Sequence, residues 1–141
     1  MTLPVLPSFV RDRTELDGFK LYRAGGPNGV KKVGCVVLVT IDTDDEATAR
    51  AWVDSVFVAL SSEPNPHPGG ISAAFHIRED GKQVINYAEW VSAEDHAEAL
   101  SDGNGVGSVT TDWRRVQNFP GVRQGGFVRY QPLAKIQSEV E

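Results

Sequence analysis

Two polar side chains in the stretch "VINYAEW" are of types that could bind a ligand. Asn86 offers an amide and Trp90 an indole N–H, and the two residues stand close together in the chain. The stretch alternates as a β-strand does, with successive side chains pointing to opposite faces. One face then carries Val84, Asn86, Ala88 and Trp90. An amide and an indole among aliphatic neighbours make this face a candidate ligand pocket.

Three histidines are the other groups with acid–base chemistry near neutral pH. His76 lies in the strand-like run "ISAAFHIR", His96 in the short helical segment "AEDHAEAL", and His67 in the loop "NPHP". Their spacing fits no metal-ligand pattern, and no cysteine or carboxylate pair completes one, so no metal site is predicted. His67 is predicted to lie on the surface of its loop.

The residues that would position Asn86 belong to a predicted hairpin. The turn "EDG" (79–81) separates the runs "ISAAFHIR" and "KQVINYAEWV" and is a strong hairpin signal. A two-residue turn places Phe75 opposite Asn86 and His76 on the other face. A three-residue turn places His76 diagonal to Asn86. The sequence leaves both registers open, and a slip by one residue exchanges the faces.

The other predicted elements complete a β-α-β-β-α-(α)-β order. "GCVVLVTI" (34–41) is a nearly continuous apolar run, typical of a strand covered on both faces. Thr43 and Glu46 form a capping box before an apolar stripe with helical spacing, which predicts the first helix. A second helix is predicted at "AEDHAEAL" and a third over 108–118. A last strand is predicted over 127–131, after a turn at "FPGVRQGG".

This order is that of a ferredoxin-like α+β sandwich. We predict an N-terminal arm over residues 1–33, with a short strand at 19–23, one domain over 34–132 and a C-terminal tail over 133–141. Helices cover only one face of such a sheet, and apolar side chains remain on the other. A second copy that packs sheet to sheet would bury them, so a homodimer is predicted.

The net charge, the apolar runs and the single cysteine of the chain limit its possible binding partners and its location in the cell. The chain has 141 residues and a formal net charge of −5. Because it has no basic cluster, we predict neither nucleic acid nor an anionic membrane as a partner. No apolar run approaches the roughly 20 residues of a membrane helix, and the N-terminus is a poor signal peptide. A single cysteine, Cys35, rules out an intrachain disulfide, so a cytoplasmic location is predicted.

The segment "PGGISAAFHIREDGKQVINYAEWVSAEDHAEA" (68–99) resembles the central part of the antibiotic biosynthesis monooxygenase family. These are small dimeric α+β barrel proteins that include cofactor-independent oxygenases of aromatic polyketide pathways. The resemblance therefore implies a dimeric α+β barrel and an aromatic small-molecule substrate. The matching residues are Pro68-Gly69, Ser72, His76 after an aromatic residue, Asp80-Gly81 and, above all, Asn86-Tyr87-Ala88 with Trp90.

The resemblance also implies a reaction. In the quinone-forming members, a tricyclic phenolic anthrone reacts with molecular oxygen without flavin or metal. By resemblance, Asn86 and Trp90 are the predicted catalytic residues, as hydrogen-bond donors. Four residues along a strand span roughly 13 Å, so they would address opposite ends of a ring system. No bound cofactor is predicted, although a reduced flavin from a partner protein stays open. The predicted substrate-binding residues are Phe75, His76, His96 and Arg114.

Two positions depart from the family pattern. Polyketide members carry a tyrosine in the second helix where this chain has His96. This puts a tyrosine-based proton relay in doubt, although histidine could still exchange a proton near neutral pH. Those members also carry an arginine ahead of the final Pro-Gly, and Arg114 or Arg115 lies close to that position.

Other functions stay open on this barrel. A polyketide cyclase or isomerase needs only acid–base groups, and a non-catalytic dimeric module would merely hold an aromatic ligand. Haem-degrading members place a haem-ligating histidine at the position of Leu100, which argues against haem degradation. The leading prediction is a cofactor-independent monooxygenase that oxidises an anthrone-like polyketide intermediate.

Overall fold

The structure is a computed structural model that describes residues 2–27, 31–63, 66–101 and 110–133. The predicted tail beyond Leu133 and the first two residues of the predicted third helix lie outside the described residues.

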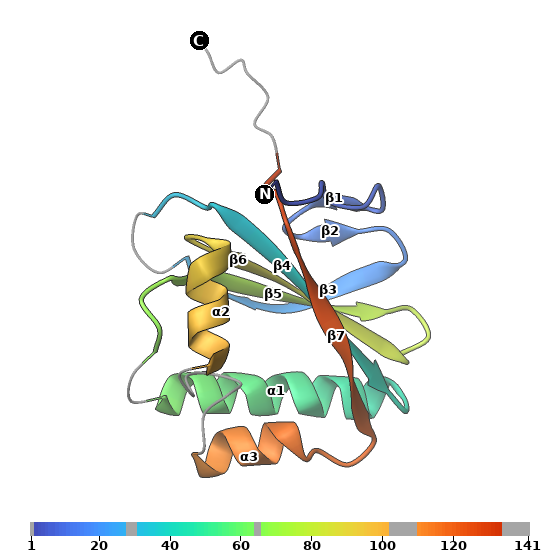
Figure 1. The fold of residues 1–141 in the computed structure, drawn as a ribbon. Coiled ribbons are helices and arrows are strands. Elements are labelled where there is room, and N and C mark those ends of the chain that lie inside the picture. Colours follow the sequence, from blue (N-terminus) through green and yellow to red (C-terminus); the bar gives the residue numbers. More distant parts are fainter. Residues whose placement is uncertain (1, 28–30, 64–65, 102–109, 134–141) are drawn as a thin grey trace.

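A five-stranded antiparallel sheet forms the centre of the molecule, with strand order β3-β5-β6-β4-β7 (Figure 1). From β4 onward the elements follow the predicted β-α-β-β-α-α-β order. Residues of the predicted arm add β3 beside β5, so the boundary at residue 33 falls between strands of one sheet. The strands are β3 (Phe19–Gly25), β4 (Cys35–Thr43), β5 (Gly70–Arg78), β6 (Gln83–Trp90) and β7 (Val122–Tyr130).

Three helices cover one face of this sheet: α1 (Glu46–Ser62), α2 (Ala93–Ser101) and α3 (Thr111–Gln117). Figure 1 shows α1 and α3 side by side, with α2 apart from them. The apolar residues of α1 and α3 pack on one half of the face, and α2 lies over the other half. Val39 of β4 packs against both groups, so it marks the line where they meet. None of these described helices is long and apolar enough to cross a membrane.

The N-cap of helix α1 lies two residues later than predicted. Asp45 is the N-cap, and its Oδ1 accepts a 2.8 Å hydrogen bond from the backbone N–H of Thr48. Thr43 instead ends β4, where its buried hydroxyl donates to the carbonyl of Gly81 at 2.7 Å. The predicted capping box of Thr43 and Glu46 is therefore wrong, because this hydroxyl joins the strand to the hairpin turn.

The central hairpin adopts the first of the two predicted registers. Phe75 lies opposite Asn86 and His76 opposite Ile85. Gly81 takes a φ of 75° in the turn, a conformation that glycine adopts without strain. Asn86 therefore faces the helices, and His76 faces the other side of the sheet.

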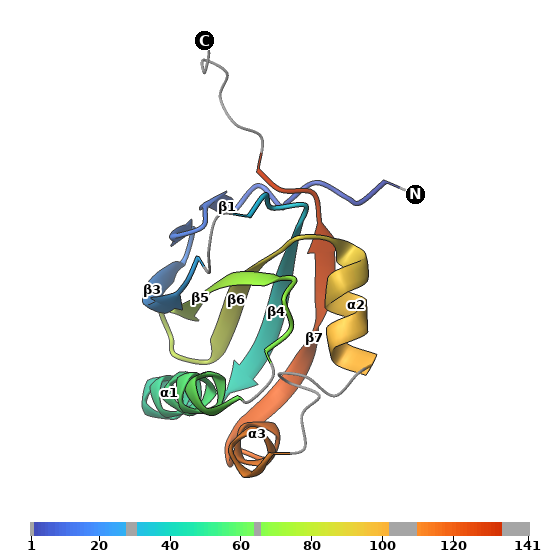
Figure 2. The ribbon, with the colours of Figure 1, turned by 90° about the vertical axis from the view of Figure 1, so that its left-hand side faces the viewer.

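The N-terminal arm covers much of that other side. A small hairpin of β1 (Val10–Asp12) and β2 (Glu15–Leu16) packs its buried residues against the sheet (Figure 2). The buried residues of the hairpin and of the sheet form one apolar cluster. Part of the surface that was expected to need a second copy is thus buried by the chain itself, which weakens that argument for a homodimer. The buried cluster consists of Val10, Leu16, Val36, Leu38, Ala74, Ile85 and Tyr87.

The side chain of Arg13 fastens this hairpin to the sheet. Its Nε donates to Ser72 Oγ at 3.2 Å, and its Nη2 donates to the carbonyl of Gly25 at 3.0 Å. Ser72 Oγ donates in turn to Glu89 at 2.6 Å. A second attachment lies at the start of the chain, where the backbone N–H of Gln131 donates to the carbonyl of Pro4 at 2.8 Å.

The last strand is longer than predicted. "VRQGG" was expected to be part of a turn, but it forms the first half of β7. The register of β4 and β7 shifts between Val39 and Ile41, which marks a bulge. Gly126 takes a φ of 95° there, and a Cβ on Gly125 would lie 2.8 Å from the carbonyl oxygen of Thr40. The two glycines therefore permit the bulge in the strand instead of ending it.

Candidate active site

Asn86 lies on β6 in the middle of the helix-covered face. Its neighbours across the strands are Phe75 on β5 and Val39 on β4. Since Val39 marks the line between the two halves of this face, Asn86 lies at the boundary between the half covered by α1 and α3 and the half covered by α2. The residue is half-buried, and its Oδ1 is fully buried without a hydrogen-bond partner.

The unpartnered amide oxygen is an unusual feature in a folded protein. A buried polar group that lacks a partner costs on the order of 1–3 kcal/mol, so such groups call for a physical explanation. Rotation of the side-chain amide by 180° would present its N–H₂ group in place of the oxygen. In either orientation, Asn86 holds a polar group toward the helices that a ligand or a water could bond.

Trp90 lies at the far end of the same strand and on the same face. Its ring centroid is 5.2 Å from that of His96 and 5.8 Å from that of His67. Between Asn86 and Trp90 the face carries small residues, with Ala88 and Val37 paired across the strands. The prediction that Asn86 and Trp90 lie on one face of the strand is therefore confirmed.

His96 projects from α2 against Trp90 and is 6% exposed. Its Nδ1 accepts a 3.0 Å hydrogen bond from Nε of Arg129. Burial, together with the positive charge of Arg129, lowers the pKa of His96 to about 4. The ring is therefore neutral at pH 7, and because Nδ1 is the acceptor, its single proton is on Nε2. In this state His96 is a hydrogen-bond donor, since its lone pair is already engaged.

Arg129 on β7 is a residue that the sequence interpretation missed. It pairs with Val37 of β4, so it belongs to the helix-covered face. Phe127, two residues earlier, shares this face, and its ring centroid lies 4.9 Å from that of His96. The alternation in "FVRY" could have indicated that Phe127 and Arg129 point the same way.

Arg114, the arginine predicted to bind substrate, is exposed on α3. Trp113 and Val116 are the buried residues of this helix, which turns Arg114 outward. Among the described residues, it makes no hydrogen bond to Asn86, Trp90 or His96. The substrate-binding role of Arg114 stays a prediction, and the arginine that contacts His96 is Arg129.

His76 also lies outside this group. The hairpin register places it on the arm-covered face, where it is fully buried and its Nε2 lies 3.0 Å from the carbonyl of Arg13. Burial lowers the pKa of His76. Its Nδ1 has no partner. The prediction that His76 shares a pocket with Asn86 is wrong, because the two-residue turn sets the other register.

Phe75 does share the face of Asn86, but its surroundings are those of a core residue. The ring is 3% exposed and makes edge contacts with Trp52 and Phe57 of α1, with centroids 6.1 Å and 5.5 Å away. These contacts fix the strand below α1 and, through the register, fix the position of Asn86. The substrate-binding role of Phe75 stays a prediction.

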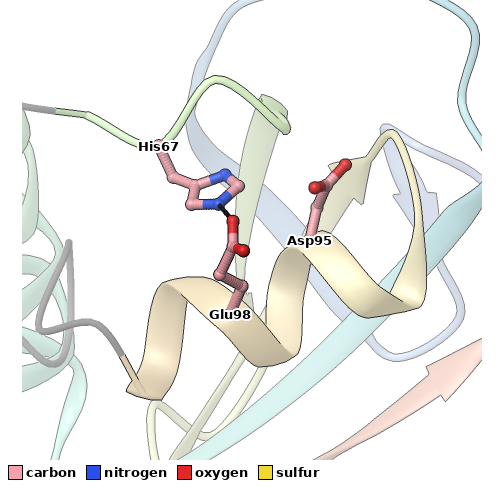
Figure 3. Close-up of side chains that lie close together, drawn as sticks. All are labelled: His67, Asp95 and Glu98. Carbon is pink, nitrogen blue, oxygen red and sulfur yellow. Dashed lines mark hydrogen bonds and ion pairs between the residues drawn. The ribbon is translucent and has the colours of Figure 1, made fainter.

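His67, Asp95 and Glu98 come together at the outer side of α2 (Figure 3), with candidate ligand atoms within 4.8 Å of one another. His67 is not the surface residue predicted, since its side chain is 6% exposed. Its Nδ1 accepts a 2.9 Å bond from Gly69 N–H, so Nε2 carries the proton and donates to Glu98 at 2.7 Å. A metal-ligating histidine donates through its second ring nitrogen. Here that nitrogen accepts from Gly69 N–H, so the arrangement fits a histidine that fastens its loop to α2.

Two hollows lined by described residues lie apart from Asn86 and Trp90. One lies on the arm-covered face and includes Phe9, Leu38, Ile85 and Val128. The other lies beside β3 and the start of α1. Neither of these two hollows includes Asn86 or Trp90.

Comparison with known proteins links the chain to monooxygenases. No family model matches the sequence. A tetracenomycin-F1 monooxygenase of Streptomyces glaucescens is 57% identical over 28 residues, which are 20% of this chain and 25% of that protein. The chain thus matches only about a quarter of the length of this curated relative.

Solved structures show the same fold. A monooxygenase from the gene ActVA-Orf6 of Streptomyces coelicolor, solved with the ligand nanaomycin D, has a TM-score of 0.55 and 25% identity. The similarity covers 74% of this chain and 92% of that one. The haem-degrading enzyme LmHde of Listeria monocytogenes also has a TM-score of 0.55, over 94% of this chain and 84% of its own. At 14% identity, this second likeness concerns the fold alone.

The predicted relationship is thereby confirmed on two separate grounds, a short stretch of high identity to one monooxygenase and a shared fold with another. The α+β class is confirmed with it. The chain is a ferredoxin-like α+β protein related to the antibiotic biosynthesis monooxygenases.

Proposed function

We propose that this protein is a cofactor-independent monooxygenase that oxidises a polycyclic, anthrone-like phenolic polyketide intermediate with molecular oxygen. The observation that carries the proposal is the side-chain amide of Asn86, which has a buried, unpartnered oxygen, lies on the same face as Trp90 and can donate through its N–H₂ group. The likeness to two named polyketide monooxygenases supports the same reaction class.

The substrate supplies all the electrons of the proposed reaction. Loss of a proton from the central ring carbon leaves a delocalised carbanion, which passes one electron to O2. The resulting radical pair combines to a peroxide, and the peroxide loses water to leave a ring carbonyl. One oxygen atom enters the product, the other leaves as water, and no external reductant is needed.

The described residues supply binding and electrostatics for this sequence. The Asn86 amide and the Nε2–H of neutral His96 are hydrogen-bond donors that stabilise negative oxygen. Trp90 and Phe127 provide aromatic surfaces on either side of His96. His96 is proposed as a donor and not as the base, because its lone pair is held by Arg129.

The test uses 1,8-dihydroxyanthrone with the purified protein. We expect quinone formation above the enzyme-free background in air, none under nitrogen, and incorporation of one ¹⁸O atom from ¹⁸O2. Asn86→Ala is expected to lower kcat about 100-fold. Gln83→Ala, which removes an amide from the same strand but the opposite face, is the matched control. A product with unchanged oxygen count would identify a cyclase or isomerase instead.

The assembly and location are parts of the same proposal. We propose a homodimer formed through the part of the arm-covered face that remains open, where Val128 is 47% exposed. The hollow between the arm and β7 lies there. The cytoplasmic location stays a prediction that rests on Cys35.

A further inference from the structure

Arg129 differs from the other charged residues of the sheet in its environment. It is half-buried on the helix-covered face, and its guanidinium carbon lies 5.0 Å from the ring centroid of Phe127. Nε donates to His96 Nδ1 at 3.0 Å. Its two terminal nitrogens make no hydrogen bond to any described residue.

Most arginines in the described part of the chain are paired with carboxylates. Arg129 has no carboxylate within 4.0 Å among the described residues, although it is less exposed than most of them. A partly buried cation is costly when no opposite charge compensates it. An anion that binds beside Arg129 would supply the missing charge. The arginines that form ion pairs are Arg11, Arg13, Arg23, Arg50, Arg78 and Arg123.

The partner of Arg129 preserves its positive charge. A carboxylate in the place of His96 would hold the guanidinium and neutralise it. The imidazole accepts the same hydrogen bond but carries no charge, because burial and Arg129 itself lower the pKa of His96 to about 4. His96 therefore orients Arg129 and leaves its full charge available to a ligand.

The surroundings indicate the rest of the ligand. The rings of Trp90, His96 and Phe127 follow one another at 5.2 Å and 4.9 Å, each pair edge to face. Phe127 is 43% exposed, so this row of rings reaches the surface at the edge strand β7. A flat aromatic molecule that enters here would place an acidic oxygen near Arg129.

We propose that Arg129 binds the anionic oxygen of an aromatic ligand, a carboxylate or an ionised phenol or enol, and so selects acidic aromatics over neutral ones. The inference deepens the proposed function, on which it rests for the identity of the substrate. Bidentate contacts of arginine with a carboxylate are among the stronger charge-assisted hydrogen bonds.

The test measures binding without turnover. 2-Naphthoate and 2-naphthamide have the same ring system and differ in charge, and quenching of tryptophan fluorescence or calorimetry reports their affinity. We expect the wild type to prefer the naphthoate about tenfold, which corresponds to about 1.4 kcal/mol. Arg129→Gln should abolish the preference while its affinity for the amide stays the same.

Two further variants keep the experiment decisive. Arg123→Gln removes an equal charge from the same strand, at an exposed residue paired with Asp44, and should keep the full preference. Arg129→Lys keeps the charge without the fork of N–H groups and should retain part of it, even if Arg129→Gln folds poorly.

The results also separate this inference from the proposed function. A wild type that binds both probes equally or binds neither, or an Arg129→Gln variant that still prefers the naphthoate, would overturn the role of Arg129. A normal naphthoate preference without oxygen-dependent quinone formation would leave Arg129 as an anion-binding residue and overturn the monooxygenase proposal alone.

Discussion

The Nε–H of Arg129 meets Nδ1 of His96 at 3.0 Å, so a cation and an imidazole are joined by a hydrogen bond in which the histidine is the acceptor. This contact sets the tautomer of the ring and opposes its protonation. It also connects β7 to α2, two elements that are separated in the chain by α3. The candidate site therefore depends on a hydrogen bond between α2, the helix that covers it, and the edge strand β7.

His96 is expected to make the protein less stable in mild acid. The pKa of its ring is lowered to about 4 from 6.5, mainly by burial. As the pH falls from 6.5 to 4, the unfolded chain binds a proton that the folded chain does not. The free energy of unfolding should then fall by up to about 3 kcal/mol, and this contribution should level off below pH 4. Urea unfolding at several pH values measures it.

His96→Gln is the control for that prediction. The variant keeps the other titrating groups, including His76 on the opposite face. Its stability should therefore vary less with pH than that of the wild type between pH 4 and 6.5. Parallel curves for the two proteins would show that His96 does not carry the effect.

Replacing Asn86 by leucine is expected to separate stability from turnover. The buried Oδ1 has no partner, so an apolar side chain of similar size removes an uncompensated polar group. We expect the free energy of unfolding to rise by about 1 kcal/mol and kcat to fall about 100-fold. Gln83→Leu, which removes an amide that bonds Asp42, should neither raise the free energy of unfolding nor lower kcat. A marked loss of stability in Asn86→Leu would assign the amide to the fold.

Loss of the Arg13 side chain is expected to loosen the N-terminal hairpin. Arg13 bonds Ser72 and the carbonyl of Gly25 and is only 26% exposed, so Arg13→Gln should cost about 1–3 kcal/mol. Arg11→Gln breaks an exposed pair with Asp17 and should cost less than about 1 kcal/mol. Urea unfolding gives both values, and hydrogen exchange in β1 and β2 should increase only in the first variant. Equal effects would mean that Arg13 does not hold the hairpin.

The proposed homodimer predicts that a charge on the open face blocks association. Val128→Asp should convert a dimer to a monomer in light-scattering chromatography, because it places a carboxylate in a dry contact. Val58→Asp, at an equally exposed valine of α1, should leave the dimer intact. A wild-type protein that stays monomeric at high concentration would contradict the proposed homodimer. The N-terminal arm would then be the main element that covers this face.

The sequence predicted the elements that carry Asn86 and Trp90 because their signals are local. The hairpin turn and the alternation around it indicate both strands, and Ser92 caps α2 through a 3.0 Å bond from Asp95 N–H, as its spacing suggests. The choice between the two registers could not be made, since both satisfy the turn and differ only in which face meets the helices.

The missed features depend on contacts between distant parts of the chain. Nothing local in "VRQGGFVRY" distinguishes a bulged edge strand from a turn followed by a short strand, so the inward direction of Arg129 was not assigned. The arm carried prolines and turn residues, and its packing depends on Arg13 reaching Ser72, far along the chain. Such pairings are decided by the assembled sheet.

The bond from Gln131 to Pro4 has a consequence for the order in which the molecule assembles. It links residues from nearly opposite ends of the polypeptide, so it cannot close until β7 has been synthesised. The central hairpin, whose partners are near neighbours in the chain, is free to form long before that. The β1–β2 hairpin can dock as soon as β3 and β5 exist, since Arg13 bonds Gly25 and Ser72, whereas the segment around Pro4 would take its place last.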